Sequence, residues 1–215
     1  MPILTHNVRT RETEHLRLEP ITAAHVGDYL TVFNDDAIAE WYAGKPTREE
    51  AVADVARIER AWNVLGVHKW LAYEVSSGEV VGRGGLSCMV LGSDVACQVV
   101  ELLRPAPWLD EAFNPGNGMQ LARRWFEIGW ALRGAFWGRG YASEIARAGL
   151  DYAFEELAAR AVVSFTERHN ARSRAVMERM GMTYAGEFLW EGLLEGVEGV
   201  HPDAPFALYV ITSPE

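Results

Sequence analysis

One strand–turn–helix segment constrains the fold of this chain more than any other feature. Between residues 125 and 132 every second side chain is apolar, which predicts a strand with one buried face. A glycine-punctuated turn follows at 133–140, and from Tyr141 apolar residues recur at helical spacing to about Leu157. With a further strand at 161–166 and a helix after it, this unit implies a right-handed crossover and a locally parallel strand pair. The chain is therefore predicted to have an α/β fold.

The remaining segments predict a mixed sheet with helices on both faces. The first 13 residues are polar and predict a flexible tail, which leaves 14–215 as a single domain. Residues 92–122 form a long excursion, with one short strand expected near 99–103; excursions of this length are often functional. The other expected elements are a strand at 16–19, a helix from Thr22 to Phe33, a helix begun by the Thr47–Glu50 capping box and ended by Gly66, a hairpin of 70–75 with 80–89, a helix at 171–180 closed by Gly181, and strands at 184–190 and 206–212 joined by a loop.

The net charge of −10 limits the partners of the chain. An acidic protein repels a phosphate backbone, which argues against nucleic acid and is mildly favourable for a cationic amine. Cys88 and Cys97 lack CxxC spacing and the histidines form no HExxH pattern, so no metal site is predicted. The sequence shows neither a signal-peptide run nor an apolar stretch of membrane length, so we expect a cytoplasmic protein with no membrane association.

The glycine turn is the most informative site for chemistry. Gly138 and Gly140 allow backbone conformations closed to other residues, and the free amides at the following helix N-terminus favour an anion such as a diphosphate. Arg133 and Arg139 can add charge-assisted hydrogen bonds. A P-loop needs a lysine that is absent here, and a dinucleotide fingerprint needs glycine where Ser143 stands.

Three linked runs carry a resemblance to a known family. Residues 136–144 read FWGRGYASE, residues 127–132 read EIGWAL, and a later run has the form NxxSxxxMxxxGM from Asn170 to Met182. Together they resemble the GNAT superfamily of N-acetyltransferases, especially the branch that includes ribosomal-protein N-terminal acetyltransferases. The resemblance implies a single GNAT-like domain with a mostly antiparallel central sheet and a splayed parallel pair.

The resemblance also implies a reaction and a cofactor. An acetyl group would pass directly from acetyl-CoA (coenzyme A) to a primary amine, carried by a small molecule or by a protein N-terminus. Backbone amides of the splayed strand would polarise the thioester carbonyl. The residues that this resemblance assigns to the cofactor are Trp130, Ala131, Leu132, Trp137, Gly138, Arg139, Gly140, Tyr141, Ala142, Asn170 and Arg174.

Two residues are candidates for proton transfer. Glu127 faces away from the apolar side of its strand and is the candidate base; the alternative is a solvated strand glutamate. Ser173 matches a serine of this branch considered as the acid; the alternative is a hydroxyl of a helix first turn that bonds backbone or a cofactor phosphate. The sequence departs from the wider superfamily at Ala135, where Gln or Arg is frequent, and at Met177, where many members have a tyrosine acid.

Several cofactor and acceptor candidates have structural alternatives. Asn170 can cap the helix that follows it, Arg174 can be a surface residue, and Trp137 and Tyr141 can anchor the loop to the core. Some of the aromatic residues are expected to line an acceptor pocket, although aromatic side chains more often belong to a core. Those aromatic candidates are Trp41, Tyr42, Trp108, Phe113 and Trp190, and the acidic residues that can attract an amine or simply be solvated are Glu191, Glu195, Glu198 and Asp203.

Two other functions compete with the acetyltransferase. The missing tyrosine acid is compatible with a non-catalytic module that binds acyl-CoA, and the near match to a dinucleotide fingerprint is compatible with a nucleotide-binding oxidoreductase. Edge strands in such folds often pair between subunits, so a homodimer is a further expectation.

Overall fold

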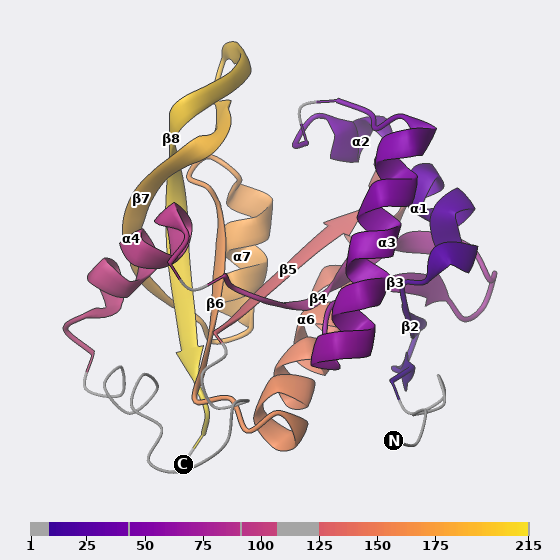
Figure 1. The fold of residues 1–215 in the computed structure, drawn as a ribbon, viewed down its shortest axis with the longest axis horizontal. Helices are drawn as coiled ribbons and strands as arrows, with labels where there is room; N and C mark the ends of the chain where they lie inside the picture. The colour runs from indigo at the N-terminus through magenta and orange to yellow at the C-terminus, as the bar shows by residue number, and fades with distance from the viewer. Residues whose placement is uncertain (1–8, 43, 91, 107–124, 215) are drawn as a thin grey trace. The chain divides into compact units, whose positions relative to one another are not determined.

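The computed structural model describes residues 9–42, 44–90, 92–106 and 125–214 (Figure 1). Their contacts divide the chain into two compact units, each built from separate stretches of sequence. Unit 1 consists of Met1–Leu86 and Gly129–Ala148, and unit 2 of Ser87–Ile128 and Gly149–Glu215. Strands β4 and β5 and helix α6 each contribute residues to both units.

Unit 1 contains an antiparallel sheet with the strand order β1-β2-β3-β4-β5. In its registers Leu18 pairs with Ala72 and Trp70 with Gly84. Leu16 and Leu18 are fully buried and alternate with half-buried residues, as the sequence pattern predicts. The strands are β1 (Arg11–Glu12), β2 (Leu16–Pro20), β3 (Lys69–Glu74), β4 (Val80–Cys88) and β5 (Phe126–Leu132).

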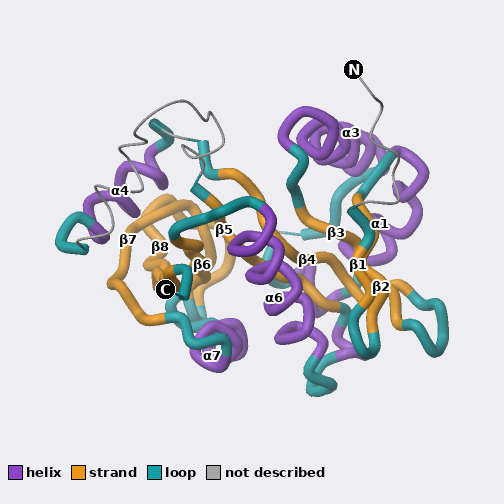
Figure 2. The backbone as a smooth tube through the Cα atoms, turned by 90° about the horizontal axis from the view of Figure 1, so that it is seen from below, coloured by secondary structure: helices purple, strands orange, loops and turns teal. Residues whose placement is uncertain are grey.

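Helices cover this sheet on opposite sides, and Figure 2 shows α3 on one side of β3 and β4 and α6 on the other. The side chains of Thr47 and Glu50 form the predicted capping box at the start of α3, and Gly66 ends that helix at a φ of +76°. Trp62 of α3 packs against Trp70, with 5.7 Å between ring centroids. The helices are η2 (Ala23–His25), α1 (Val26–Phe33), α2 (Asp36–Ala39), α3 (Arg48–Leu65), η4 (Gly134–Phe136) and α6 (Tyr141–Asp151).

Unit 2 has the strand order β5-β6-β8-β7, and α4 and α7 lie on opposite sides of these strands (Figure 2). One face of α4 packs on the sheet, since Val95, Val99 and Leu103 share a core with Phe188 and Phe206. The further elements are α4 (Asp94–Leu103), η5 (Tyr152–Glu156), β6 (Ala161–Glu167), α7 (Ala171–Arg179), β7 (Thr183–Leu194) and β8 (Val197–Thr212).

The predicted parallel pair is formed by β5 and β6. Phe126 pairs with Val162 and Glu127 with Val163, while β6 and β7 both pair antiparallel with β8. At the next level the Ser164 hydroxyl donates to the Ile128 carbonyl at 2.8 Å, so a side chain bridges the two strands there. The mixed, mostly antiparallel sheet with one parallel pair is confirmed.

Three local expectations need correction. The segment near 99–103 is the end of helix α4 and not a strand, because Ser93 caps a helix whose apolar residues recur every four positions. Residues 191–205 are not a loop but parts of β7 and β8, which meet at a tight turn near Gly196. Within the expected tail, Arg11–Glu12 already pairs with β2, so ordered structure begins before residue 14; residues 1–8 lie outside the described part.

The capping box of α3 leads to a stability prediction. Replacing Thr47 with alanine removes the acceptor for the Glu50 backbone amide and the bond to the Glu50 carboxylate. We expect the free energy of unfolding to fall by about 1 kcal/mol, measured by urea denaturation. Thr31→Ala is the control, because Thr31 is an exposed residue inside α1; an equal loss in both variants would contradict a specific role of the cap.

Candidate functional site

The glycine loop lies between β5 and α6 in unit 1, as the sequence predicts. Gly138 and Gly140 have φ values of +77° and +84°, which disfavour any residue with a side chain. A Cβ added to either glycine would meet no atom within 4 Å among the described residues. Glycine is therefore required by the backbone conformation and not by crowding, and the exposed side of the loop is open to a ligand. The Glu144 amide bonds the Gly140 carbonyl at 3.1 Å as α6 begins.

The buried carboxylate of Glu74, at the end of β3, binds two residues of the glycine loop. It accepts hydrogen bonds from the Tyr141 hydroxyl at 2.6 Å and from Arg139 Nη1 at 3.1 Å. The Ser77 hydroxyl donates to its other oxygen at 2.7 Å. The bond from Tyr141, followed by that from Ser77 and the charge of Arg139, lowers the pKa of Glu74, and the same bond raises the pKa of Tyr141. Sequence reasoning missed Glu74; its one signal was a charged residue in an otherwise apolar strand.

Other contacts fix both ends of the loop. Trp137 Nε1 donates to the Leu132 carbonyl at 2.8 Å, and Arg133 Nη1 donates to the Val80 carbonyl at 2.8 Å. Glu144, in the first turn of α6, accepts from the backbone amide of His15 at 2.8 Å and from the Thr13 hydroxyl. The side chains of Trp137 and Tyr141 thus act as anchors in this structure. Hydrogen bonds to β3, β4 and β5 therefore fix the loop on the sheet.

Strand β5 approaches β4 closely just before the loop. A Cβ on Gly82 would lie 2.2 Å from the Ala131 carbonyl oxygen, and one on Gly84 would lie 3.1 Å from that of Gly129. The glycines of β4 therefore allow a backbone contact that other residues would prevent. Of the predicted cofactor-binding residues, Ala131 and Leu132 are buried, and Trp130 and Ala142 are half-buried.

The candidate acid and base lie in unit 2. Glu127 is half-buried on β5, and its Oε2 accepts a hydrogen bond from the Ser87 hydroxyl at 2.7 Å. Asn170 caps α7, since its Oδ1 accepts from the Ser173 amide at 3.1 Å. This places the half-buried Ser173 in the first turn of α7, and Met177 of the same helix is buried in the core.

Arg174 of α7 bonds one residue of β8 and the residue that follows β6. Its Nε donates to the Tyr209 hydroxyl and its Nη1 to the Arg168 carbonyl, both at 3.1 Å. The bond to Tyr209 raises the pKa of the guanidinium. The hydrogen bond to Tyr209 therefore links α7 to β8, and the role of Arg174 in cofactor binding stays a prediction.

The residues predicted to contact the acceptor lie in different surroundings. Trp190 packs on Phe165 and Phe206, at 6.0 and 5.6 Å between centroids, and Trp41 is half-buried. Trp108 and Phe113 lie outside the described residues. The acidic residues Glu191, Glu195, Glu198 and Asp203 are all exposed on the β7–β8 hairpin.

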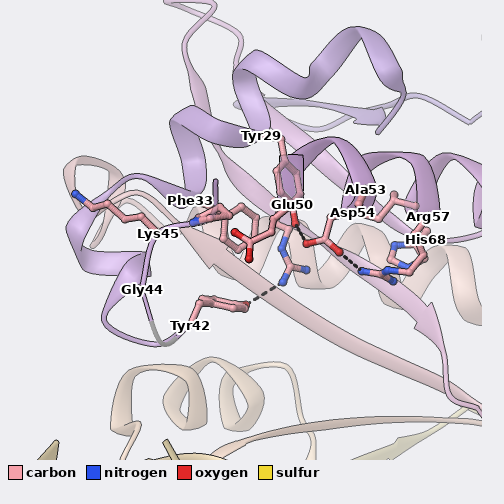
Figure 3. Close-up of a pocket in the computed structure, with 13 residues that line it drawn as sticks. Tyr29, Phe33, Tyr42, Gly44, Lys45, Glu50, Ala53, Asp54, Arg57 and His68 are labelled. Atoms are coloured by element: carbon pink, nitrogen blue, oxygen red, sulfur yellow. Dashed lines mark hydrogen bonds and ion pairs between the residues drawn. The ribbon is translucent and has the colours of Figure 1, made fainter. Parts of the chain in front are cut away.

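Tyr42 lines a pocket of about 580 Å³ inside unit 1 (Figure 3). The pocket lies between α1, the segment before α3, α3 itself and β4. Its aromatic walls come mainly from Tyr29, Phe33 and Tyr42, and charged residues of both signs complete it. The other lining residues are Gly44, Lys45, Pro46, Glu50, Ala53, Asp54, Arg57, Ile58, His68 and Arg83.

Two kinds of structure are absent from the described residues. Among them there is no group of three or more His, Cys, Asp or Glu side chains that could hold a metal ion. In the same part of the chain, no helix has both the length and the apolar character needed to cross a membrane.

A family model and a curated relative both relate this chain to acetyltransferases. A family model described as "Acetyltransferase (GNAT) domain" matches residues 15–183. The chain is 31% identical over 182 residues to the FsC-acetyl coenzyme A-N(2)-transacetylase of Aspergillus fumigatus, covering 83% of this chain and 67% of that protein. It is 27% identical over 154 residues to the uncharacterized protein YkkB of Bacillus subtilis, covering 72% and 73%.

Solved structures share the fold. A putative GNAT-family acetyltransferase from Bordetella pertussis has a TM-score of 0.66 and 20% identity, covering 94% of this chain and 98% of that one. A ribosomal-protein-S5-alanine acetyltransferase from Vibrio fischeri has a TM-score of 0.66 and 12% identity, covering 95% and 96%.

The Glu74 cluster predicts a pH-dependent loss of stability. Because its pKa is lowered in the folded state, Glu74 stabilises the fold above its ordinary pKa near 4.5, and this contribution disappears as pH falls through the lowered value. We expect Glu74→Gln to be less stable than wild type at pH 7, with a difference that shrinks below pH 4.5, measured by chemical denaturation. Glu79→Gln, at an exposed position of the same hairpin, is the control; a constant difference at all pH values would contradict the prediction.

Proposed function

The chain belongs to the GNAT acetyltransferase family, and from this premise we propose that it transfers an acetyl group from acetyl-CoA to a primary amine held next to β5. The proposal rests chiefly on the glycine loop at the start of α6, where a Cβ on Gly138 or Gly140 would meet no described atom within 4 Å. Backbone amides in this position bind phosphate oxygens without a lysine. The non-catalytic acyl-CoA-binding module remains the alternative.

The loop residues fit coenzyme A. Gly138 and Gly140 leave the space that a diphosphate needs, and Trp137 and Tyr141 hold the loop in place through their bonds to Leu132 and Glu74. Backbone amides of Trp130, Ala131 and Leu132 would bind the thioester end, and Asn170 the pantetheine arm. Bound acetyl-CoA supplies an activated acyl group as a thioester.

We propose that Glu127 and Ser173 move the protons. Glu127 would accept the proton that the attacking amine releases, directly or through water, with one carboxylate oxygen held by Ser87. Ser173 would donate a proton to the departing sulfur. In the balanced reaction a nitrogen–carbon bond forms and a carbon–sulfur bond breaks, while one proton leaves the amine and one reaches the sulfur.

The acceptor class is also part of the proposal. The Aspergillus relative is named for transfer to an N(2) atom, whereas the Vibrio protein is named for an alanine of a ribosomal protein. The pocket in unit 1 has a volume typical of sites for small organic ligands. We therefore favour a small-molecule amine over a protein N-terminus.

Binding of acetyl-CoA tests the loop. In the double variant Gly138→Asp/Gly140→Asp, negative side chains occupy the proposed phosphate site, so we expect isothermal titration to show at least a hundredfold weaker binding, about 3 kcal/mol or more. The matched control is Gly196→Asp/Gly199→Asp, because both of these glycines also have positive φ and open surroundings. Equal binding by the two double variants would contradict the proposed site.

Kinetics test the proton-transfer residues. We expect Glu127→Gln and Ser173→Ala each to lower kcat/KM by about 100-fold while acetyl-CoA binding is retained. Ser87→Ala removes only the hydrogen bond to Glu127, so its effect should be smaller. Full activity of Glu127→Gln would exclude its carboxylate as the base, and tight cofactor binding without turnover of any amine by wild type would favour the non-catalytic alternative.

A further inference from the structure

Asp35 joins two segments of unit 1 that are far apart in the sequence. Its Oδ1 accepts a hydrogen bond from the backbone amide of Ala37 at 3.1 Å, and this bond caps α2. The same oxygen accepts from the backbone amide of Gly134, also at 3.1 Å, although Gly134 follows Asp35 by 99 residues. The other oxygen, Oδ2, lies 3.8 Å from Nε of Arg133. One carboxylate therefore holds the first turn of α2 and the beginning of the glycine loop together.

The same two segments are closely packed. A Cβ added to Gly134 would lie 3.1 Å from the Cβ of Ala37 and 3.7 Å from Oδ1 of Asp35. A larger residue at position 134 would therefore push α2 and the loop apart. On the sheet, the backbone amide of Arg133 bonds the Val81 carbonyl at 3.0 Å. The beginning of the glycine loop is thus bonded both to β4 and to Asp35.

Helix α2 depends on tertiary contacts for its stability. It has four residues, and a helix of this length is not stable by itself in water. Its contacts include the cap from Asp35 and the burial of Ile38. Local unfolding opens neighbouring segments together when they share the contacts that hold them. We therefore expect α2 to open together with the beginning of the glycine loop.

Residues that follow α2 line one side of the pocket of unit 1. The backbone amides of Tyr42 and Gly44 donate to the Ala39 carbonyl at 3.3 and 3.1 Å. Nζ of Lys45 lies 2.6 Å from Oδ1 of Asp36. Tyr42, Gly44 and Lys45 all line the pocket, and Figure 3 shows them on one side of it. The position of this pocket wall therefore depends on α2.

We propose that Asp35 is a positioning residue that links the glycine loop to α2, so that acetyl-CoA bound at the loop orders the pocket wall formed by Tyr42, Gly44 and Lys45. The inference rests on the proposed binding of acetyl-CoA at that loop. A ligand that binds only the ordered loop makes the opening of the loop rarer by a factor of 1 + [L]/Kd. When α2 opens only together with the loop, the same factor applies to α2.

Hydrogen exchange of the full chain, followed by mass spectrometry of its peptides, tests this link. Isothermal titration first gives the Kd of each variant for acetyl-CoA. Exchange is then compared without ligand and with acetyl-CoA at about 20 times that Kd. For wild type we expect acetyl-CoA to slow exchange by about ten- to twentyfold in peptides that cover 134–141 and equally in peptides that cover 36–42. Equal slowing indicates that the two segments open together.

Variants of Asp35 assign the link to its carboxylate. Asp35→Ala removes the acceptor of both amides, so acetyl-CoA should slow exchange in 36–42 by about twofold or less, while the slowing in 134–141 persists. Asp35→Asn keeps an oxygen that can accept both amides, so it should retain most of the wild-type effect.

Asp36→Ala is the matched control, and it should behave like wild type. Asp36 lies in the first turn of the same helix, and its carboxylate pairs with Lys45. Thermal unfolding of each variant reports whether it is folded. If Asp35→Ala is unfolded, unequal slowing of the two segments in wild type still overturns the inference.

The outcomes separate this inference from the proposed function. If acetyl-CoA binds wild type without slowing exchange in 36–42, the link is overturned while the cofactor site stands. The same holds if the slowing in 36–42 is as large in Asp35→Ala as in wild type, or if Asp36→Ala loses it as completely. If calorimetry shows that wild type does not bind acetyl-CoA, the proposed function fails, and the inference that rests on it fails too.

Discussion

The close approach of β4 to β5 is the constraint on which the rest of the site depends. A side chain at Gly82 or Gly84 would lie 2.2 Å from the Ala131 carbonyl or 2.5 Å from Ile145 of α6, closer than real contacts allow. The two glycines therefore let a strand and a helix pack directly on β4. The glycine loop follows β5 directly, and α6 provides the helix N-terminus after it. Because the residue between the glycines points to the opposite face, one short stretch of β4 serves both the loop and the pocket.

The charges around the glycine loop decide which groups would bind the diphosphate of the proposed cofactor. Arg139 is paired with the buried carboxylate of Glu74, and Arg133 lies 3.8 Å from the carboxylate of Asp35. In these pairs the arginines order the loop, and much of their charge is balanced by protein carboxylates. Attraction for phosphate oxygens then comes chiefly from the backbone amides around Gly138 and Gly140 and from the start of α6. The glycines are thus more important than the arginines to the proposed function.

Local signals made much of the fold predictable, and long-range contacts account for what was missed. The capping box of Thr47 and the cap formed by Asn170 depend on residues three apart, so the sequence indicates them directly. The strand–turn–helix around Gly138 is equally local. By contrast, Glu74 and Tyr141 are 67 residues apart in the sequence, and Arg83 and Tyr42 are 41 residues apart. No local pattern predicts either contact. The apolar residues of α4 also fit a strand when the local sequence is considered alone. Packing of Val95, Val99 and Leu103 against Phe188 of β7 favours the helix.

The arginines of unit 1 differ in the contacts that hold them. The carboxylates of Asp35 and Glu74 balance much of the charge of Arg133 and Arg139. These two arginines therefore stabilise the scaffold more than they attract a ligand. The rings of Phe33 and Tyr42 pack against the guanidinium of Arg83, which also donates a hydrogen bond to the Tyr42 hydroxyl. In the same pocket burial is the first cause of the depressed pKa of His68, and the charges of Lys69, Arg57 and Arg83 lower it further. Contacts with carboxylates and contacts with aromatic rings are thus two separate ways in which this unit fixes its arginines in the scaffold.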